Sequence, residues 1–346
     1  MSLAAGPCLR SPVVDIRDID IADDDAMAAL YAVEARSATV GRESMPHWTH
    51  QELLGAYRSG DSGERQEVFG VFEGEDLLGF ASAWFPLLDN LDKTYVDLHV
   101  DPPARRRGVG RTLVEDLERR ARADGRTMLL TDSKVPPGQR ESHPYSRFAV
   151  AMGFEFSNVE VVRHLALPVA GERLAAWTAK AAERHAGYTI ATYVDEFPDE
   201  LAESLCTLLG QLAVDAPTGL VDFEEEDFNV ERLKERYETT AAMGRALYET
   251  VALSPDGEVV AQSTLAVAKG EGPDVFQWGT FVHREHRGHR LGLAVKVANI
   301  AAVQDAYPDK RRITTQNAES NDFMVDINKE IGFEAVEDSM EWIKRL

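Results

Sequence analysis

One stretch, residues 95–124, constrains the fold of this chain more than any other. It begins as a strand, because Val96, Leu98 and Val100 alternate with polar neighbours at the two-residue period of a sheet. Two prolines from Pro102 onward end the strand, since proline cannot donate a hydrogen bond to a sheet. Apolar residues then recur at helical spacing. The stretch therefore predicts a strand, a short basic turn and an amphipathic helix.

The turn has the composition of an anion-binding loop. It carries three arginines from Arg105 onward, followed by Gly108 and Gly110. A helix N-terminus offers unpaired N–H groups and a partial positive charge, both of which suit a phosphate. Glycine lets the backbone approach a ligand where a Cβ would collide with it. We call residues 105–110 the first anion loop.

Other phosphate-binding patterns and nucleic acid fit less well. A dinucleotide-binding loop needs a third glycine, but Thr112 and Leu113 follow Gly110, and no Gly-Lys-Ser/Thr of a P-loop is present. The chain has 59 acidic and 37 basic residues, a formal net charge of −22. Such a charge disfavours nucleic acid as a partner. It could attract a cationic amine, but plain solubility is the favoured explanation.

The same pattern occurs a second time. Residues 280–292 align without gaps on residues 98–110, and the second copy of the turn, residues 287–292, is here called the second anion loop. A repeat about 180 residues long indicates a duplicated domain, because solenoid units repeat every 20–50 residues or so. The matched pairs are Val100 with Val282, Arg105 with Arg287, Gly110 with Gly292, and Gly153-Phe154 with Gly332-Phe333.

The motif Arg105-x-x-Gly108-x-Gly110 after a proline-ended strand resembles the acetyl-CoA loop of the GCN5-related N-acetyltransferase (GNAT) superfamily. Its two copies resemble the tandem members of that superfamily, which include mycothiol synthases. The resemblance implies an α/β fold with a mixed sheet, made of two tandem GNAT-like acyl-CoA N-acyltransferase domains. The predicted boundaries are 1–168 for the first domain, 169–187 for a helical linker and 188–346 for the second domain.

The resemblance also implies acetyl-CoA as cofactor. In the superfamily, the strands on either side of the loop helix diverge, and pantetheine lies in the gap. Here the gaps would lie between 96–100 and 127–131, and between 277–282 and 311–316. The implied cofactor-binding residues are Leu98, His99, Val100, Arg105, Arg106, Arg107, Gly108, Val109, Gly110, Arg111, Phe281, Val282, Arg287, Gly288, His289, Arg290, Leu291, Gly292, Asn317 and Asn321.

The implied reaction is attack of a neutral amine on the thioester, which requires a base, an oxyanion donor and an acid. The chain departs from the family here. Thr94 and Phe276 stand where many relatives have a glutamate base, and Ala149 and Asn328 stand where many have a tyrosine acid. Tyr145 is the nearest tyrosine in the first half.

Four residues are the catalytic candidates. Asp97 and His99 could relay a proton in the first half, or could simply be partly exposed strand residues. In the second half the amide of Asn328 could hydrogen-bond an oxyanion or coenzyme A, and Asn321 could do the same or cap a helix. Mycothiol synthase-like enzymes keep catalysis in the second copy, which favours that copy here. Against it, Arg290 replaces the glycine found at Gly108.

Two further clusters have alternative interpretations. His283, His286 and His289 are spaced by three, but no cysteine or carboxylate completes a metal site, so phosphate contact or exposure is favoured and no metal is predicted. The acidic run at 224–227 could meet a cationic acceptor or could begin a helix. Helices are predicted at 198–214 and 224–242, a first strand at 13–19 and a closing edge strand at 340–346.

The predicted function is transfer of an acetyl group to the amine of a small molecule. Amino sugars, antibiotics, polyamines and thiol precursors are all compatible acceptors. The alternatives are acetylation of a protein or peptide and an acyl-CoA-binding sensor without turnover. Two cysteines, Cys8 and Cys206, predict a reducing cytoplasm. The apolar helix at 291–303 is too short to span a membrane, and the residues do not specify an oligomeric state.

Overall fold

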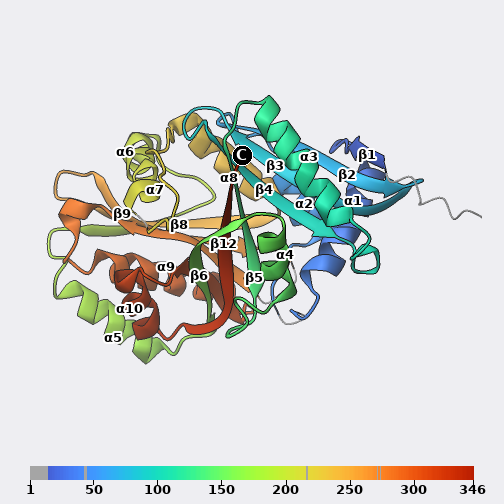
Figure 1. Cartoon of the computed structure of the whole chain (residues 1–346). Coiled ribbons are helices and arrows are strands. Elements are labelled where there is room, and N and C mark those ends of the chain that lie inside the picture. The colour runs from blue at the N-terminus through green and yellow to red at the C-terminus, as the bar shows by residue number, and fades with distance from the viewer. Residues whose placement is uncertain (1–14, 43–44, 216, 271, 273) are drawn as a thin grey trace, which may run out of the picture.

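A computed structural model of the chain describes residues 15–42, 45–215, 217–270, 272 and 274–346. Within these residues, a 12-stranded sheet has the order β1-β2-β3-β4-β5-β12-β6-β11-β10-β9-β8-β7. Figure 1 shows the two halves of the chain on either side of the central strands β12 and β6.

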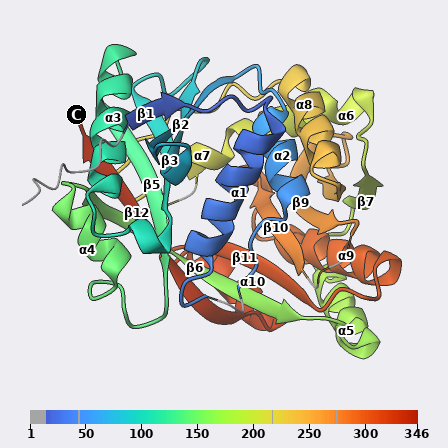
Figure 2. The same cartoon turned by 90° about the vertical axis from the view of Figure 1, so that its right-hand side faces the viewer.

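The first half contains β1 (Asp15–Asp18), α1 (Asp24–Ala38), α2 (His50–Arg58), β2 (Glu64–Glu73), β3 (Asp76–Pro86), β4 (Lys93–Val100), α3 (Val109–Ala123), β5 (Met128–Val135), α4 (Pro144–Ala151) and β6 (Glu155–Ala166). Helix α3 packs on one face of its strands through Leu113 and Leu117. Helices α1 and α2 cover the other face through Leu30 and Leu53 (Figure 2). Residues 13 and 14 of the predicted first strand lie outside the described residues.

The second half repeats this order after the helix α5 (Gly171–Ala182). It contains β7 (Thr189–Val194), α6 (Asp199–Gly210), α7 (Leu212–Asp215), α8 (Val230–Ala242), β8 (Arg245–Leu253), β9 (Val259–Ala268), β10 (Asp274–Val282), α9 (Leu291–Ala306), β11 (Arg312–Ala318), α10 (Asp322–Ile331) and β12 (Glu334–Arg345). Helices α5 and α9 share one apolar cluster, and α6 and α8 form another. The linker helix thus packs on the second half.

The predicted edge strand at the C-terminus is wrong. Strand β12 lies at the centre of the sheet, where it pairs antiparallel with β5 on one side and with β6 on the other. Strand β6 in turn pairs with β11 of the second half. Met340, Trp342 and Ile343 are all buried, as expected for a strand covered on both faces. The last strand of each half therefore joins the sheet of the other, while the domain boundaries given above stay a prediction.

Two helix predictions in the second half need correction. Helix α8 begins at Val230 rather than at 224, because the Asn229 side chain accepts hydrogen bonds from the Glu231 and Arg232 N–H groups and so caps the helix there. The acidic run before it is irregular. The helix predicted over 198–214 is divided into α6 and α7 at Gln211.

Helix α2 of the first half packs closely on α8 of the second. The contact depends on Gly55, where a Cβ would meet the backbone at Met243. Beside it, the Arg245 guanidinium donates a 2.8 Å hydrogen bond to the Glu52 carboxylate, and both side chains are buried. Glu52 also completes the α2 capping box with Thr49. The two halves are therefore joined by a buried ion pair as well as by shared strands.

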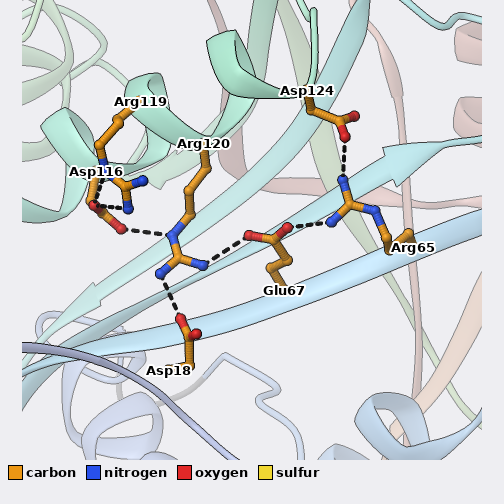
Figure 3. Close-up of polar contacts among 7 residues, drawn as sticks. All are labelled: Asp18, Arg65, Glu67, Asp116, Arg119, Arg120 and Asp124. Carbon is orange, nitrogen blue, oxygen red and sulfur yellow. Dashed lines mark hydrogen bonds and ion pairs between the residues drawn. The ribbon is translucent and has the colours of Figure 1, made fainter.

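A network of ion pairs ties α3 to the strands beneath it (Figure 3). Arg120 is central, since its guanidinium reaches Asp116 on the same helix, Glu67 on β2 and Asp18 on β1. Arg65 likewise pairs with both Glu67 and Asp124, the residue that caps the C-terminal end of α3. The network fixes the helix whose N-terminus forms the first anion loop.

Candidate functional site

The two anion loops have the same backbone shape. Each contains two residues in the left-handed region, at equivalent positions: Arg106 and Gly108 have φ of 65° and 93°, while Gly288 and Arg290 have φ of 86° and 55°. The second of each pair is the N-cap of the following helix, α3 or α9. The predicted duplication of the turn is therefore confirmed in the backbone.

Both loops present unpaired N–H groups at a helix N-terminus. In the described residues, the N–H groups of Val109 and Gly110 have no acceptor, and neither do those of Leu291 and Gly292. Such groups are unpaired because a helix has no preceding turn to supply carbonyls. Space above the loops is limited: a Cβ on Gly110 would be 3.0 Å from Phe148 Cζ. Glycine thus keeps the approach to these donors open.

The strands beside each loop diverge as predicted. Strands β4 and β5 pair in parallel only up to Tyr95 and Leu130, after which β4 pairs with β3 alone and β5 with β12. Strands β10 and β11 pair only up to Phe276 and Thr314. Beyond that point β10 has a bulge at Trp278 in its pairing with β9. Each half therefore has a gap that starts next to its anion loop.

Most arginines in the first loop and just after it are not paired with a carboxylate. Arg105 donates only to neutral oxygens, namely the carbonyls of Val100 and Ser37 and the Tyr145 hydroxyl. Within the described part of the chain, Arg106 and Arg111 contact no carboxylate, and both are exposed. Arg107 pairs with Glu73. A diphosphate at this loop would meet two N–H donors and cations that are not already neutralised.

The arginines in the second loop and just before it are paired with carboxylates of the same protein. Arg284 and Arg287 both bind Asp215, at 2.6 and 2.7 Å, and the Asp215 side chain is 9% exposed. Arg290 binds Glu183 at 2.6 Å and also donates to a carbonyl at the C-terminal end of α5. The backbone of this loop suits an anion, but its side-chain cations are balanced within the protein. The first loop therefore keeps more positive charge that is not paired with a carboxylate than the second.

Asp97 and His99 form a hydrogen-bonded chain in the first half. His99 Nε2 lies 3.0 Å from Asp97 Oδ2, and His99 Nδ1 lies 2.7 Å from the Ser37 hydroxyl of α1. Burial lowers the pKa of His99, but the adjacent Asp97 outweighs it, so the pKa lies above the ordinary value. Partial burial of Asp97 opposes its charge, yet His99 and the Leu98 N–H hold its pKa below the usual range. This hydrogen-bonded chain can take up a proton at His99, where the Asp97 carboxylate stabilises it.

Other groups surround this chain. Glu34 on α1 has a buried carboxylate oxygen without a partner in the described residues, and burial raises its pKa. The Tyr145 hydroxyl donates to the Ser37 carbonyl at 3.3 Å. Sequence reasoning did not find Ser37 or Glu34, because they come from a helix far from β4 in the sequence. Only the folded sheet brings α1 beside the loop strand.

The asparagines of the second half are largely structural. Asn321 caps α10 by accepting from the Met324 N–H. Asn328 is fully buried and donates to Asn317 Oδ1, which also accepts from Arg163. Asn328 Oδ1 has no partner among the described residues. The fold brings Asn317 and Asn328 together, and their catalytic roles stay predictions.

The three histidines in the second loop and just before it have separate hydrogen-bond partners. His283 accepts from the Glu285 N–H, while His286 Nδ1 lies 2.9 Å from the Tyr188 hydroxyl and His289 Nδ1 lies 3.1 Å from a carbonyl of the linker. Across the described ranges, no group of three or more His, Cys, Asp or Glu side chains could hold a metal ion. No described helix combines the length and apolar character needed to cross a bilayer.

Comparisons with known proteins fit this geometry. Residues 27–145, which include the first anion loop, match the model of the acetyltransferase (GNAT) family. A tandem GNAT protein from the clavulanic acid biosynthesis pathway superposes with a TM-score of 0.76 at 24% identity, covering 96% of this chain and 98% of that one. This chain is a tandem GNAT-fold protein.

Other solved structures superpose on the chain with lower TM-scores. A GCN5-related N-acetyltransferase from Sphaerobacter thermophilus has a TM-score of 0.62 at 15% identity, covering 96% of this chain and 95% of that one. Saccharomyces cerevisiae N-myristoyltransferase, solved with myristoyl-CoA, has a TM-score of 0.62 at 12% identity, covering 99% of this chain and 82% of that one. No curated protein sequence matched the chain.

Proposed function

We propose that this tandem GNAT-fold protein transfers an acetyl group from acetyl-CoA to the amine of a small molecule, and that the first half binds the cofactor. The observation that carries the proposal is the difference between the two loops. Arg106 and Arg111 are free of carboxylates in the described residues, whereas Arg284, Arg287 and Arg290 are all engaged. This reverses the preference for the second half that the mycothiol synthase resemblance suggested.

Residues of the first half would serve each step of the proposed reaction. The Val109 and Gly110 N–H groups and Arg106 would hold the diphosphate, and the gap between β4 and β5 would take the pantetheine arm. When bound, acetyl-CoA supplies an activated acyl group. N–H donors of the diverging strand β4, other than that of Leu98, which already donates to Asp97, would bind the thioester oxygen and stabilise the developing negative charge.

His99 would accept the proton of the attacking amine. Its ring nitrogens contact Asp97 and Ser37, so the proton would travel through the Ser37 hydroxyl, which lies 2.7 Å from His99 Nδ1. For this step the hydroxyl would turn from the Glu34 carbonyl, its acceptor at 2.9 Å, to donate to the ring. Asp97 then stabilises the charged imidazole. The Tyr145 hydroxyl, which donates to the Ser37 carbonyl, would protonate the departing thiolate. This arrangement replaces the glutamate and tyrosine that many relatives place elsewhere.

Thiol release from acetyl-CoA over a panel of amines tests the proposal. The panel should include an amino sugar, a polyamine, a free amino acid and a peptide with a free N-terminus. Turnover should fall at least tenfold in Gly110→Leu, because the leucine side chain would meet Phe148 and cover the N–H donors. Gly292→Leu is the matched control at the second loop and should keep acetyl-CoA turnover near that of the wild type.

Each other result has a definite meaning. Loss of turnover in Gly292→Leu but not in Gly110→Leu would place the cofactor in the second half and refute the assignment. Binding of acetyl-CoA by calorimetry without turnover of any amine would favour an acyl-CoA-binding sensor. Turnover of the peptide alone would favour protein N-acetylation.

A further inference from the structure

Helix α9 of the second half carries a buried lysine without a charged partner. Lys296 is 1% exposed, and among the described residues its amine has no hydrogen-bond acceptor and no carboxylate. The nitrogen lies 5.4 Å from the centre of the Phe333 ring. Burial alone lowers the pKa of Lys296 to about 7, so near neutral pH much of this amine is uncharged. A lysine is almost never fully buried unless it is paired, and the proposed reaction does not use this one.

The equivalent position in the first half is apolar. When the gapless alignment of the two anion loops is continued into the helices, Lys296 falls on Val114 and Asn299 falls on Leu117. Val114 and Leu117 are both buried in the core of the first half. Apolar residues therefore meet the packing needs of this helix face in the first copy. Polar groups at the same two positions of the second copy are costly to bury, which indicates another role for them.

The Lys296 side chain lies where β10 and β11 diverge. Lys296 follows Gly292 of the second anion loop by one helical turn, so the two residues share a face of α9. On that face, a Cβ at Gly292 would be 3.5 Å from Val282 of β10 and 3.2 Å from Ile327 of α10. Figure 1 shows α9 and α10 next to each other in this half. Phe333, which the Lys296 amine contacts, comes just after α10. Lys296 therefore points between β10 and the helix that follows β11.

Three buried side-chain oxygens around the same gap lack a hydrogen-bond donor in the described residues: those of Gln277, Asn299 and Asn328. Gln277 is the first residue of β10 after its last pair with β11. Asn299 lies beside it, because Ser263 accepts from both side-chain amides, through its carbonyl at 2.7 Å and its hydroxyl at 3.1 Å. Asn328 lies on the other side of the gap, 2.9 Å from Asn317 of β11. Buried acceptors without donors are costly unless a ligand supplies the donors.

These groups together suit an acyl thioester on an arm that contains amides. The pantetheine arm of an acyl-CoA has two amide N–H groups, the kind of donor that the three oxygens lack. The N–H groups of Leu291 and Gly292 have no acceptor in the described residues and could meet its phosphates. The nearby arginines are paired with Asp215 and Glu183, so the phosphates would be held less firmly here than at the first loop. A thioester carried into this gap would meet an uncharged amine, which is a nucleophile.

We infer that Lys296 is a site of self-acylation, at which an acyl-CoA in the gap of the second half transfers its acyl group to the lysine side chain. The lone pair of the neutral Lys296 nitrogen attacks the thioester carbonyl carbon, and the C–S bond breaks as the C–N bond forms. The proton lost by the nitrogen goes to the departing thiolate, so the products are an acyl-lysine and the thiol of coenzyme A. Each chain reacts once, and the uncharged amide removes a buried cation. The reaction goes beyond the proposed amine transfer, because the acceptor is the protein itself and the donor lies in the other half.

Peptide mapping by mass spectrometry tests the inference on the wild-type chain. The chain is incubated without any amine, with acetyl-CoA that carries an isotopically heavy acetyl group. Lys296 should gain the heavy acetyl group at least about tenfold faster than Lys329, an exposed lysine of α10 that serves as the internal control. Sulfo-N-hydroxysuccinimide acetate, which has no pantetheine arm, should reverse this order, because it reaches exposed amines first.

The pH dependence identifies the nucleophile. The rate of Lys296 acetylation should rise as pH approaches 7 and level off above it, because only the neutral amine attacks and burial lowers the pKa of Lys296 to about 7. An ordinary exposed lysine, with a pKa of about 10.4, should still gain rate well above that pH.

Two matched variants separate this reaction from the proposed amine transfer. Gly292→Leu should slow Lys296 acetylation at least about tenfold, because the leucine side chain would crowd Ile327 one turn from the lysine. Gly110→Leu, which should lower amine turnover, should leave the rate at Lys296 unchanged, so either proposal can fail without the other. Absence of the heavy acetyl group from Lys296, labelling of Lys329 as fast as Lys296 by acetyl-CoA, or equal rates in Gly292→Leu and the wild type would overturn the inference. The first two results come from the wild-type chain and do not depend on the folding of a variant.

Discussion

The substitution Gly55→Ala tests how the two halves of the molecule pack. A Cβ at Gly55 of α2 would lie 2.4 Å from the Met243 nitrogen, and 2.6 Å from both the Met243 Cα and the Ala242 carbonyl carbon. All three are backbone atoms at the end of α8, so no side-chain rotation relieves the overlap. Non-bonded carbon atoms prefer separations of about 3.5–4.0 Å. The two helices must therefore move apart by about 1 Å.

The cost of this movement can be built from its parts. Overpacking a well-packed contact costs about 1–3 kcal/mol. The shift also stretches the buried bond between Arg245 and Glu52, and complete loss of such a pair costs about 3–5 kcal/mol. Alanine recovers roughly 1 kcal/mol because it is a better helix former than glycine. We expect the free energy of unfolding to fall by about 2 kcal/mol or more.

Urea denaturation followed by tryptophan fluorescence measures this loss. The matched control is Gly60→Ala, just beyond the end of α2, where a Cβ would have no neighbour within 4 Å. The control should change the free energy of unfolding by less than about 0.5 kcal/mol. If Gly55→Ala unfolds at the same urea concentration as the wild type and the control, the close α2–α8 packing is wrong.

Three further predictions follow from other parts of the molecule. The value of kcat/KM should rise with pH as His99 loses its proton, since the base must be neutral. Asp97→Asn removes the main group that raises the pKa of His99, so the kcat/KM profile of this variant with the same amine should move to lower pH. An unshifted profile would exclude the pair as the base. Arg120→Met should lower the free energy of unfolding, measured by urea denaturation, by about 1–3 kcal/mol, and by less in high salt. Arg119→Met is the control, because the Arg119 side chain is 63% exposed, and it should cost less than about 1 kcal/mol. Equal losses in the two variants would contradict the network. Burial raises the pKa of the Cys206 thiol to about 11. In a Cys8→Ser variant, Ellman's reagent should therefore react with Cys206 slowly in buffer and fast in urea. Fast reaction in buffer would mean that the Cys206 thiol is accessible.

The parts of the fold that the sequence predicted well depend on local signals. The strand and the amphipathic helix predicted on either side of the first anion loop are β4 and α3 in the structure, because alternation, proline and helical spacing mark them locally. The second copy of the turn was found from the same local pattern, whereas the gaps beside the two turns were expected from the family resemblance. The helix start at Val230 was missed, although Asn229 is a strong N-cap, because acidic residues before it resembled a first helical turn.

The parts that were missed depend on contacts between distant segments. Nothing near β12 in the sequence shows that it will lie between β5 and β6, since its partners are far along the chain. Likewise, the Ser37 hydroxyl meets His99 only because α1 crosses β4, and Arg236 approaches Glu249 only through the packing of α8 on β8. Local periodicity identifies elements, but a site assembled from several elements needs their arrangement.

The two loops show how duplicated domains can diverge at one backbone position. Both need two left-handed residues, and a non-glycine residue in that conformation costs about 1–2 kcal/mol. The first loop places arginine at the earlier position and glycine at the later one, and the second loop reverses them. Arg106 consequently extends into solvent, where an anion can reach it, while Arg290 turns toward α5 and binds Glu183. Exchange of an arginine and a glycine between these two positions thus accompanies the change from an exposed cation to one paired within the protein, which is a reason that we place acyl-CoA in the first half.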